Sequence, residues 1–156
     1  AIAAVDQAVR RDRSGRSMTT VEEIAAYVAS HPHLHRGRRV LQILREVDGR
    51  AESPQETHVR LMLHRDGLSM FVPQIEVDGG RRRLDLGAED YLVAVEYDGR
   101  DHGDPGQQAL DAARRNSLRQ DFGWDVLVIT KDILRTGRAE FLRQVRAALT
   151  KRGWPG

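Results

Sequence analysis

The spacing of apolar residues changes several times along this 156-residue chain. In six segments apolar positions recur every three or four residues, which is the spacing of an amphipathic helix. These predicted helices cover residues 2–13, 20–30, 36–47, 53–66, 107–121 and 138–151. Four other segments alternate or are continuously apolar, which predicts strands over 71–77, 82–87, 91–98 and 124–130.

The order of these elements predicts an α/β fold. From residue 53 onward, one helix precedes three antiparallel strands, and a helix, a fourth strand and a last helix follow. Such an order predicts a mixed four-stranded sheet flanked by helices. We expect residues 1–50 to form a helical N-terminal extension, residues 51–152 to form the α/β domain, and residues 153–156 to form a loose tail.

Three acidic residues lie on the second and third predicted strands, which we expect to form a hairpin. With a turn at 88–90, Asp85 lies opposite Ala94, and Glu96 is its diagonal neighbour about 7–8 Å away. Alternation places Glu96 and Asp98 on that same face. Like charges this close repel, so the pattern predicts a bound cation or a raised pKa. Oxygen ligands without thiolates suit Mg²⁺ or Mn²⁺. Asp98 could be a further ligand, or could equally bond the backbone of the following turn.

Short motifs are spread over residues 53–150. They are Ser53-Pro54-Gln55-Glu56, Gln74, Leu84-Asp85-Leu86, Val95-Glu96-Tyr97-Asp98-Gly99 with His102, Asp111 with Arg115, and Gly123-Trp124 with Val126-Leu127. This set resembles the PD-(D/E)XK nuclease superfamily, and within it the branch like the very-short-patch repair endonuclease (Vsr). The resemblance implies a restriction-endonuclease-like core with the element order αβββαβα.

The first fifty residues carry a resemblance of their own. They are similar to the connecting region that precedes this domain in actinobacterial proteins. Those proteins often begin with a winged helix like that of abortive-infection antitoxins. The resemblance therefore implies an N-terminal winged-helix domain that is missing from this chain.

The resemblance also implies roles for individual residues. Asp85 and Glu96 would bind the divalent metal, Mg²⁺ or Mn²⁺. The family's usual lysine two residues after the glutamate is replaced by Asp98, which leaves the general base open. His102 is the family-based candidate for that base, and Lys131 is a second one.

Further site residues complete this hypothesis. The resemblance adds Glu56 to the predicted catalytic residues. Basic side chains around the loop after the third strand and on the helix that follows would hold DNA phosphates. The predicted nucleic-acid-binding residues are Arg100, Arg115, Arg119 and Lys131.

Ordinary structural roles stay open for several of these residues. Glu56 stands at the third helical position after Ser53, where a capping box favours glutamate. Asp111 and Arg115 are spaced as a helix-surface ion pair. His102 fits an exposed loop histidine, and Gln74 fits the polarity of an edge strand.

Composition narrows the function classes. The sequence pI is 9.4 at a net charge of +2, which weakly favours a polyanionic partner. Cysteine is absent and no apolar run approaches membrane length, so we expect a cytoplasmic protein without a membrane partner. Aromatic residues make up 5% of the chain, too few for the sugar cleft of a two-carboxylate glycoside hydrolase.

These observations predict a divalent-metal-dependent DNA endonuclease that hydrolyses phosphodiester bonds, in DNA repair or phage defence. The alternative is a catalytically inactive nuclease-fold module in a toxin–antitoxin or DNA-binding regulatory protein. The sequence leaves the oligomeric state and the recognised DNA open.

Overall fold

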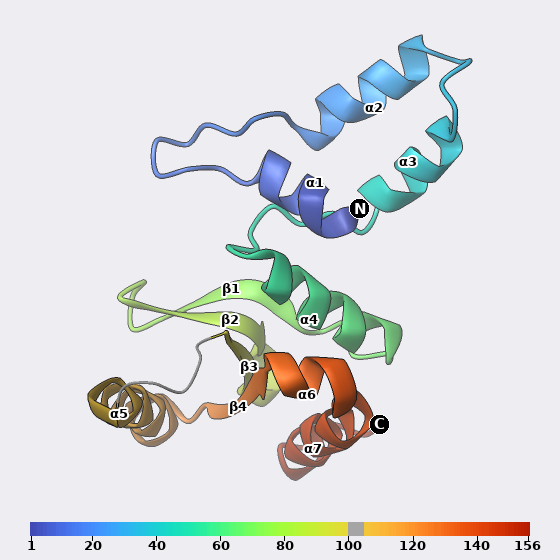
Figure 1. The fold of residues 1–156 in the computed structure, drawn as a ribbon. Coiled ribbons are helices and arrows are strands. Elements are labelled where there is room, and N and C mark those ends of the chain that lie inside the picture. The colour runs from blue at the N-terminus through green and yellow to red at the C-terminus, as the bar shows by residue number, and fades with distance from the viewer. Residues whose placement is uncertain (100–104) are drawn as a thin grey trace. The chain divides into compact units, whose positions relative to one another are not determined.

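The computed structural model describes residues 1–99 and 105–156, and its helices and strands are labelled in Figure 1. The chain divides into two compact units, residues 1–58 and residues 59–156. Each unit is described by itself. Among the described residues, no helix has both the length and the apolar character needed to cross a membrane.

The first unit is helical, as predicted. It contains α1 (Ile2–Val9), α2 (Val21–Ser30), α3 (Gly37–Leu44) and the start of α4 (Pro54–Arg65). A capping box begins α2. The Thr20 hydroxyl accepts the N–H of Glu23, and the Glu23 carboxylate accepts the N–H of Thr20.

The first helix is shorter than predicted, because it ends at Val9 rather than near residue 13. Asp12 explains the difference. Its carboxylate accepts the backbone N–H groups of Ser14 and Arg16, at 2.8 and 3.0 Å. An aspartate that bonds the backbone locally competes with helical hydrogen bonds, so the chain turns instead.

A buried aspartate ties the first unit together. Asp6 on α1 is fully buried. Its two carboxylate oxygens accept the N–H of Asp48 at 2.8 Å and the hydroxyl of Thr57 at 2.7 Å. A single side chain thus joins α1, the segment before α4, and α4 itself.

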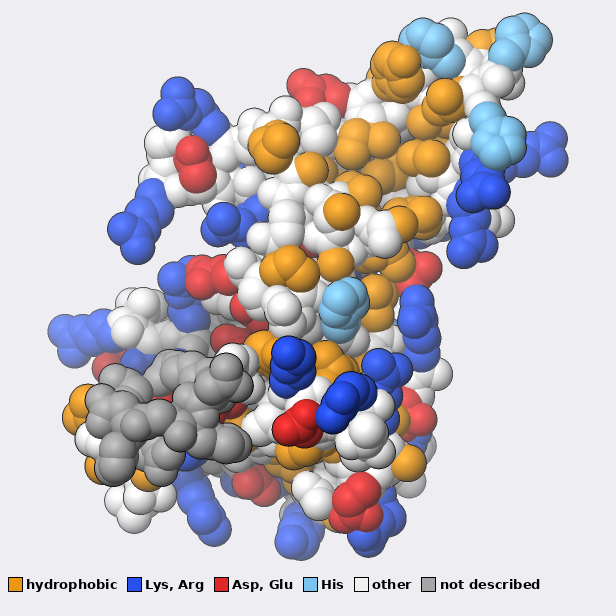
Figure 2. All heavy atoms as spheres, in the orientation of Figure 1, with side chains coloured by type: hydrophobic (Ala, Val, Ile, Leu, Met, Phe, Trp, Pro, Cys, Tyr) orange, Lys and Arg blue, Asp and Glu red, His pale blue; other side chains and the backbone are white. Residues whose placement is uncertain are grey.

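The surface of the first unit includes an apolar area over α2 and α3, where hydrophobic side chains gather in Figure 2. Tyr27, Leu34 and Leu41 are 57%, 38% and 40% exposed. A shallow groove here is lined by Val28, Leu34 and Leu41, among others.

The second unit is a mixed four-stranded sheet flanked by helices, which confirms the predicted α/β architecture at this level. The strands are β1 (Val72–Val77), β2 (Arg82–Ala88), β3 (Val93–Asp98) and β4 (Asp125–Thr130), in the sheet order β1-β2-β3-β4. The first three are antiparallel neighbours, and β4 pairs in parallel with β3. The helices of this unit are the rest of α4, α5 (Pro105–Phe122), α6 (Lys131–Thr136) and α7 (Arg138–Lys151).

Each face of the sheet has its own apolar cluster. On one face, β-strand residues such as Val93 and Val95 pack with side chains of α4 and α7. On the other, Ala94 packs with Leu118 of α5 and with Trp124. Leu110 of α5 is 65% exposed and is not part of this cluster.

The hairpin between β2 and β3 corrects two predictions. The expected turn at 88–90 is a short 3₁₀ helix, η1 (Glu89–Tyr91), and β3 begins only at Val93. The register is also shifted, since Leu86 faces Val95 and Gly87 faces Ala94. Continuing this register places Asp85 opposite Glu96 rather than opposite Ala94.

Two features of the C-terminal part were not foreseen. The sequence pattern did not predict α6, which begins directly after β4 with the Thr130 side chain accepting the N–H of Ile133. Within the segment predicted as a loose tail, Trp154 packs against the larger apolar cluster, and its ring lies 5.6 Å from the Arg146 guanidinium carbon.

Candidate functional site

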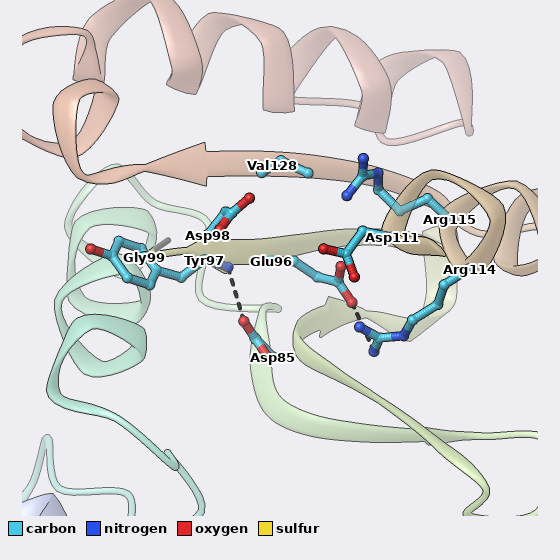
Figure 3. A pocket seen from close by; sticks show the side chains of 9 residues that line it. All are labelled: Asp85, Glu96, Tyr97, Asp98, Gly99, Asp111, Arg114, Arg115 and Val128. Carbon is cyan, nitrogen blue, oxygen red and sulfur yellow. Dashed lines mark hydrogen bonds and ion pairs between the residues drawn. The ribbon is translucent and has the colours of Figure 1, made fainter. Parts of the chain in front are cut away.

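A polar pocket of about 150 Å³ lies in the second unit, between the middle of β2, the end of β3, Val128 of β4 and α5. Figure 3 shows it from close by. Its lining residues are Asp85, Glu96, Tyr97, Asp98, Gly99, Asp111, Arg114, Arg115 and Val128. Four carboxylates and two guanidinium groups thus share one small cavity.

Strand alternation places Glu96 in this pocket. Val95 faces the apolar cluster of α4 and α7, so Glu96 points to the opposite, α5-covered face. Its register partner on β4 is Val128, which lines the same pocket. Glu96 is only 9% exposed. A carboxylate buried this deeply needs compensation from cations or hydrogen bonds.

Asp85 lies where the alternation of β2 breaks. Leu84 packs in one apolar cluster and Leu86 in the other, although residues two apart on a regular strand share a face. The Asp85 Oδ2 atom accepts the backbone N–H of Tyr97 at 2.9 Å. Its side chain therefore supplies a bond of the kind that a neighbouring strand usually makes.

The neighbouring strand β1 carries a matching distortion. Gln74 has φ +57°, a left-handed conformation that is rare within a strand for residues other than glycine. The β1–β2 register pairs Pro73 with Leu86 and Ile75 with Leu84, which places Gln74 opposite Asp85. The two strands thus depart from regular geometry at the same level, where Asp85 enters the site.

In the described part of the chain, Arg114 of α5 forms an ion pair with Glu96. Its Nη2 atom lies 3.2 Å from the Glu96 Oε1 atom, and the same nitrogen donates to the carbonyl oxygen of Arg83 at 2.7 Å. The contact with Glu96 is an ion pair without hydrogen-bond alignment. Among the residues that the structure describes, Glu96 Oε1 is a buried oxygen without a hydrogen-bond donor.

The environment of Glu96 acts on its pKa in two directions. Burial raises the pKa of the Glu96 carboxyl, and the nearby Arg114 and Arg115 lower it by less. The negative charges of Asp111 and Asp98 add to the upward shift. The net result is a carboxyl with a raised pKa, as expected where acids crowd a desolvated site.

The lining of the pocket offers carboxylate oxygens to a divalent metal. Within residues 1–99 and 105–156, no three His, Asp or Glu side chains form a group that could hold a metal ion. Mg²⁺, however, is often held by only one or two carboxylates and keeps several waters. Glu96 Oε1 has no hydrogen-bond donor among the described residues, and Glu96 lies on the strand paired with that of Asp85. Such an oxygen could bind a metal of this kind. The four carboxylates also outnumber the two guanidinium groups by two charges, which one divalent cation would balance.

The structure brings together some of the predicted site residues. Asp85, Glu96, Asp98 and Arg115 all line the pocket. Arg119 lies exposed on α5 and is not part of the lining. The predictions for Arg100 and His102 fall outside the described residues.

Lys131 and Glu56 have other surroundings. Lys131 is exposed and lies directly after β4, as the first residue of α6. Glu56 belongs to the first unit, where its Oε2 atom accepts the N–H of Glu52 and its own N–H donates to Ser53. These contacts give Glu56 the helix-capping role that the sequence left open, although with Glu52 in place of Ser53 as the donor.

Arg114 is the site residue that the sequence analysis missed. Asp111 and Arg115 were noted as an i, i+4 pair, and Arg114 is the i+3 neighbour of the same aspartate. Residues at i+3 and i+4 share a helix face. The pattern therefore held a usable signal, but only the packing of α5 against β3 shows that Arg114 faces Glu96.

Comparisons with known proteins find relatives without an assigned function. The chain is 34% identical over 143 residues to the uncharacterised proteins MT2308 and Rv2248 from two strains of Mycobacterium tuberculosis. The match covers 86% of this chain, and the chain spans about half the length of these curated relatives, 49% of each. No family model matches the sequence, and no solved structure matches it.

Proposed function

We propose that the second unit is a divalent-metal-dependent phosphodiester hydrolase that cuts DNA. The observation that carries the proposal is the pocket in which Asp85 and Glu96 lie on paired strands beneath Arg114 and Arg115. Carboxylates suit a hard cation, and arginines suit the phosphate that such a cation activates.

We further propose that the sheet belongs to the restriction-endonuclease-like class. Support comes from the element order α4, β1, β2, β3, α5, β4 and α7, with only β4 parallel to its neighbour. The inserted α6 is an addition to this order. In this assignment, the candidate acids lie on the second and third strands, as the resemblance implies.

Different residues would bind the metal, neutralise the phosphate and accept the proton during hydrolysis. Asp85 and Glu96 would hold the divalent cation, which when bound polarises the phosphoryl group and lowers the pKa of a coordinated water. Arg114 and Arg115 would neutralise the phosphate oxygens as charge builds on them. His102 remains the proposed general base, with Lys131 as the second candidate.

DNA outside the pocket would be held by charge. Arg119 extends the basic surface of α5 beyond Arg115, and Arg100 and Lys131 complete the proposed set. Each phosphate contact releases counterions, so binding should weaken steeply as salt rises. We propose DNA repair or phage defence in the cytoplasm as the setting of this activity, because both require cutting of DNA.

The test is plasmid cleavage by the 156-residue chain in Mg²⁺ or Mn²⁺. Glu96→Gln keeps the side-chain shape and removes the charge, so cleavage should fall by several orders of magnitude. Arg143→Gln is the matched control, because Arg143 is an exposed arginine in a helix-surface ion pair with Glu140 on α7. Equal cleavage by the parent and by Glu96→Gln would place the active site elsewhere.

A DNA-binding module without catalysis is the second candidate. It is favoured by Asp98, which stands where the resembled family has its lysine, and by the absence of a three-ligand metal group among the described residues. Such a module would bind DNA without cutting it in either metal. Salt-dependent DNA binding by a parent protein that leaves plasmid intact would select this candidate.

A further inference from the structure

We infer that Arg114 occupies the place of the cation in the metal-free pocket and leaves Glu96 when metal and DNA bind. This inference rests on the proposed function and adds to it a coupling between metal and substrate. Arg114 would thus act as a positioning residue with two alternative partners, the Glu96 carboxylate and a DNA phosphate.

The contacts of Arg114 show why its bond to Glu96 is replaceable. The Nη2–Oε1 distance is 3.2 Å without hydrogen-bond alignment, while the same nitrogen is held at 2.7 Å by the Arg83 carbonyl. The Arg114 side chain is 44% exposed, whereas that of Glu96 is 12% exposed. The carboxylate is therefore the buried partner of the pair, and the guanidinium can turn toward solvent once it also releases the Arg83 carbonyl.

Electrostatic repulsion explains why a divalent ion would replace Arg114 beside Glu96. Without metal, Arg114 is ion-paired with a buried carboxylate that Asp98 and Asp111 also repel. A divalent ion beside Glu96 brings two positive charges, and it would repel the guanidinium. A DNA phosphate at the mouth of the pocket then offers Arg114 a new anion, together with its neighbour Arg115.

This exchange predicts that metal and DNA bind cooperatively. Metal releases Arg114 for the phosphate, and the phosphate keeps Arg114 away from Glu96. By linkage, each ligand strengthens the binding of the other by the same factor. In a chain without the Arg114 charge, metal should bind more tightly on its own, and DNA should no longer strengthen its binding.

The experiment measures Ca²⁺ affinity by calorimetry, with and without a short DNA duplex, because Ca²⁺ commonly replaces Mg²⁺ without supporting hydrolysis. Arg114→Gln should bind Ca²⁺ about tenfold more tightly than the parent without DNA, which lies within the usual range of such couplings. Adding duplex should tighten Ca²⁺ binding by the parent and leave Arg114→Gln nearly unchanged. Arg114→Lys keeps the charge and should resemble the parent, and Arg143→Gln serves as the surface control.

The outcomes separate this inference from the proposed function. Equal or weaker Ca²⁺ binding by Arg114→Gln, in a parent that does bind Ca²⁺ through Glu96, overturns the exchange and leaves the metal site standing. If neither Ca²⁺ nor Mn²⁺ binds the parent, with or without duplex, the exchange and the metal-dependent function both fail. Tighter binding by Arg114→Gln, lost again in the double variant with Glu96→Gln, supports the exchange at this carboxylate.

Discussion

The Asp85 carboxylate accepts the backbone N–H of Tyr97 at 2.9 Å, so an acid of the candidate site also holds two strands together. Asp85 lies on β2 and Tyr97 on β3, next to Glu96. The bond fixes the Asp85 side chain at the mouth of the pocket. It also means that replacing this acid affects folding as well as chemistry.

Asp85→Ala should lower the free energy of unfolding by about 1–3 kcal/mol, because the Tyr97 N–H loses its charged acceptor. Asp85→Asn keeps an oxygen in place and should cost less, while both variants lose metal-dependent cleavage. Urea unfolding monitored by circular dichroism measures the difference. An Asp85→Ala chain as stable as Asp85→Asn would show that the hydrogen bond contributes nothing.

The raised pKa of Glu96 predicts a particular dependence of stability on pH. Because the folded-state pKa lies above the unfolded value, this carboxyl stabilises the fold most below its unfolded pKa. That contribution is lost as pH rises through the folded-state pKa. Melting temperatures of the parent and Glu96→Gln, taken in EDTA from pH 4 to 7, should therefore favour the parent most at the acid end. If the melting temperature of the parent instead rose relative to that of Glu96→Gln with increasing pH, this would contradict a raised pKa of Glu96.

The left-handed conformation of Gln74 predicts that this strand position tolerates glycine better than a β-branched residue. Gln74→Val should destabilise the second unit by roughly 1–3 kcal/mol, because a β-branched residue strongly disfavours positive φ. Gln74→Gly should be tolerated far better, since glycine adopts this conformation without strain. Glu76→Val is the matched control, because Glu76 is an exposed residue of the same strand without positive φ. Chemical denaturation compares the three, and equal costs for both valine variants would remove strain as the cause.

Asp6 should control the stability of the first unit. Asp6→Ala leaves the Asp48 N–H and the Thr57 hydroxyl without their acceptor in a buried place, which should cost roughly 2–4 kcal/mol. Thr57→Val removes only one of these bonds and should cost less. Hydrogen exchange of the amides in residues 1–58 reports the loss directly. Unchanged exchange in Asp6→Ala would show that the unit does not depend on this carboxylate.

The sequence predicted the order of the strands and the shared face of Glu96 and Asp98, because both follow from short-range patterns. Alternation in residues 93–98 is enough to place Glu96 and Asp98 on one face. That pattern does not determine the register between β2 and β3. The register depends on the 3₁₀ helix η1 and on Leu92 directly after it. Leu92 has φ +51°, a conformation that leucine rarely adopts and that sequence patterns do not reveal.

Long-range packing accounts for the rest of what was missed. Arg114 became a site residue only through the placement of α5 against β3, which no local spacing encodes. The face change at Asp85 likewise requires a matching distortion at Gln74 on another strand. Such paired departures from regular geometry are set by tertiary contacts, which override strand propensity.

The parallel pairing of β3 with β4 has a consequence for the order of folding. The hairpin contact between Ala88 and Val93 spans few residues, whereas Val93 and Asp125 must meet across the whole of α5. Local contacts form sooner than distant ones. Asp85 and Glu96 would therefore face each other early, and the arginines of α5 would arrive late. The repulsion between the two acids then slows the first step, so a divalent cation should speed refolding of the hairpin before any substrate is present.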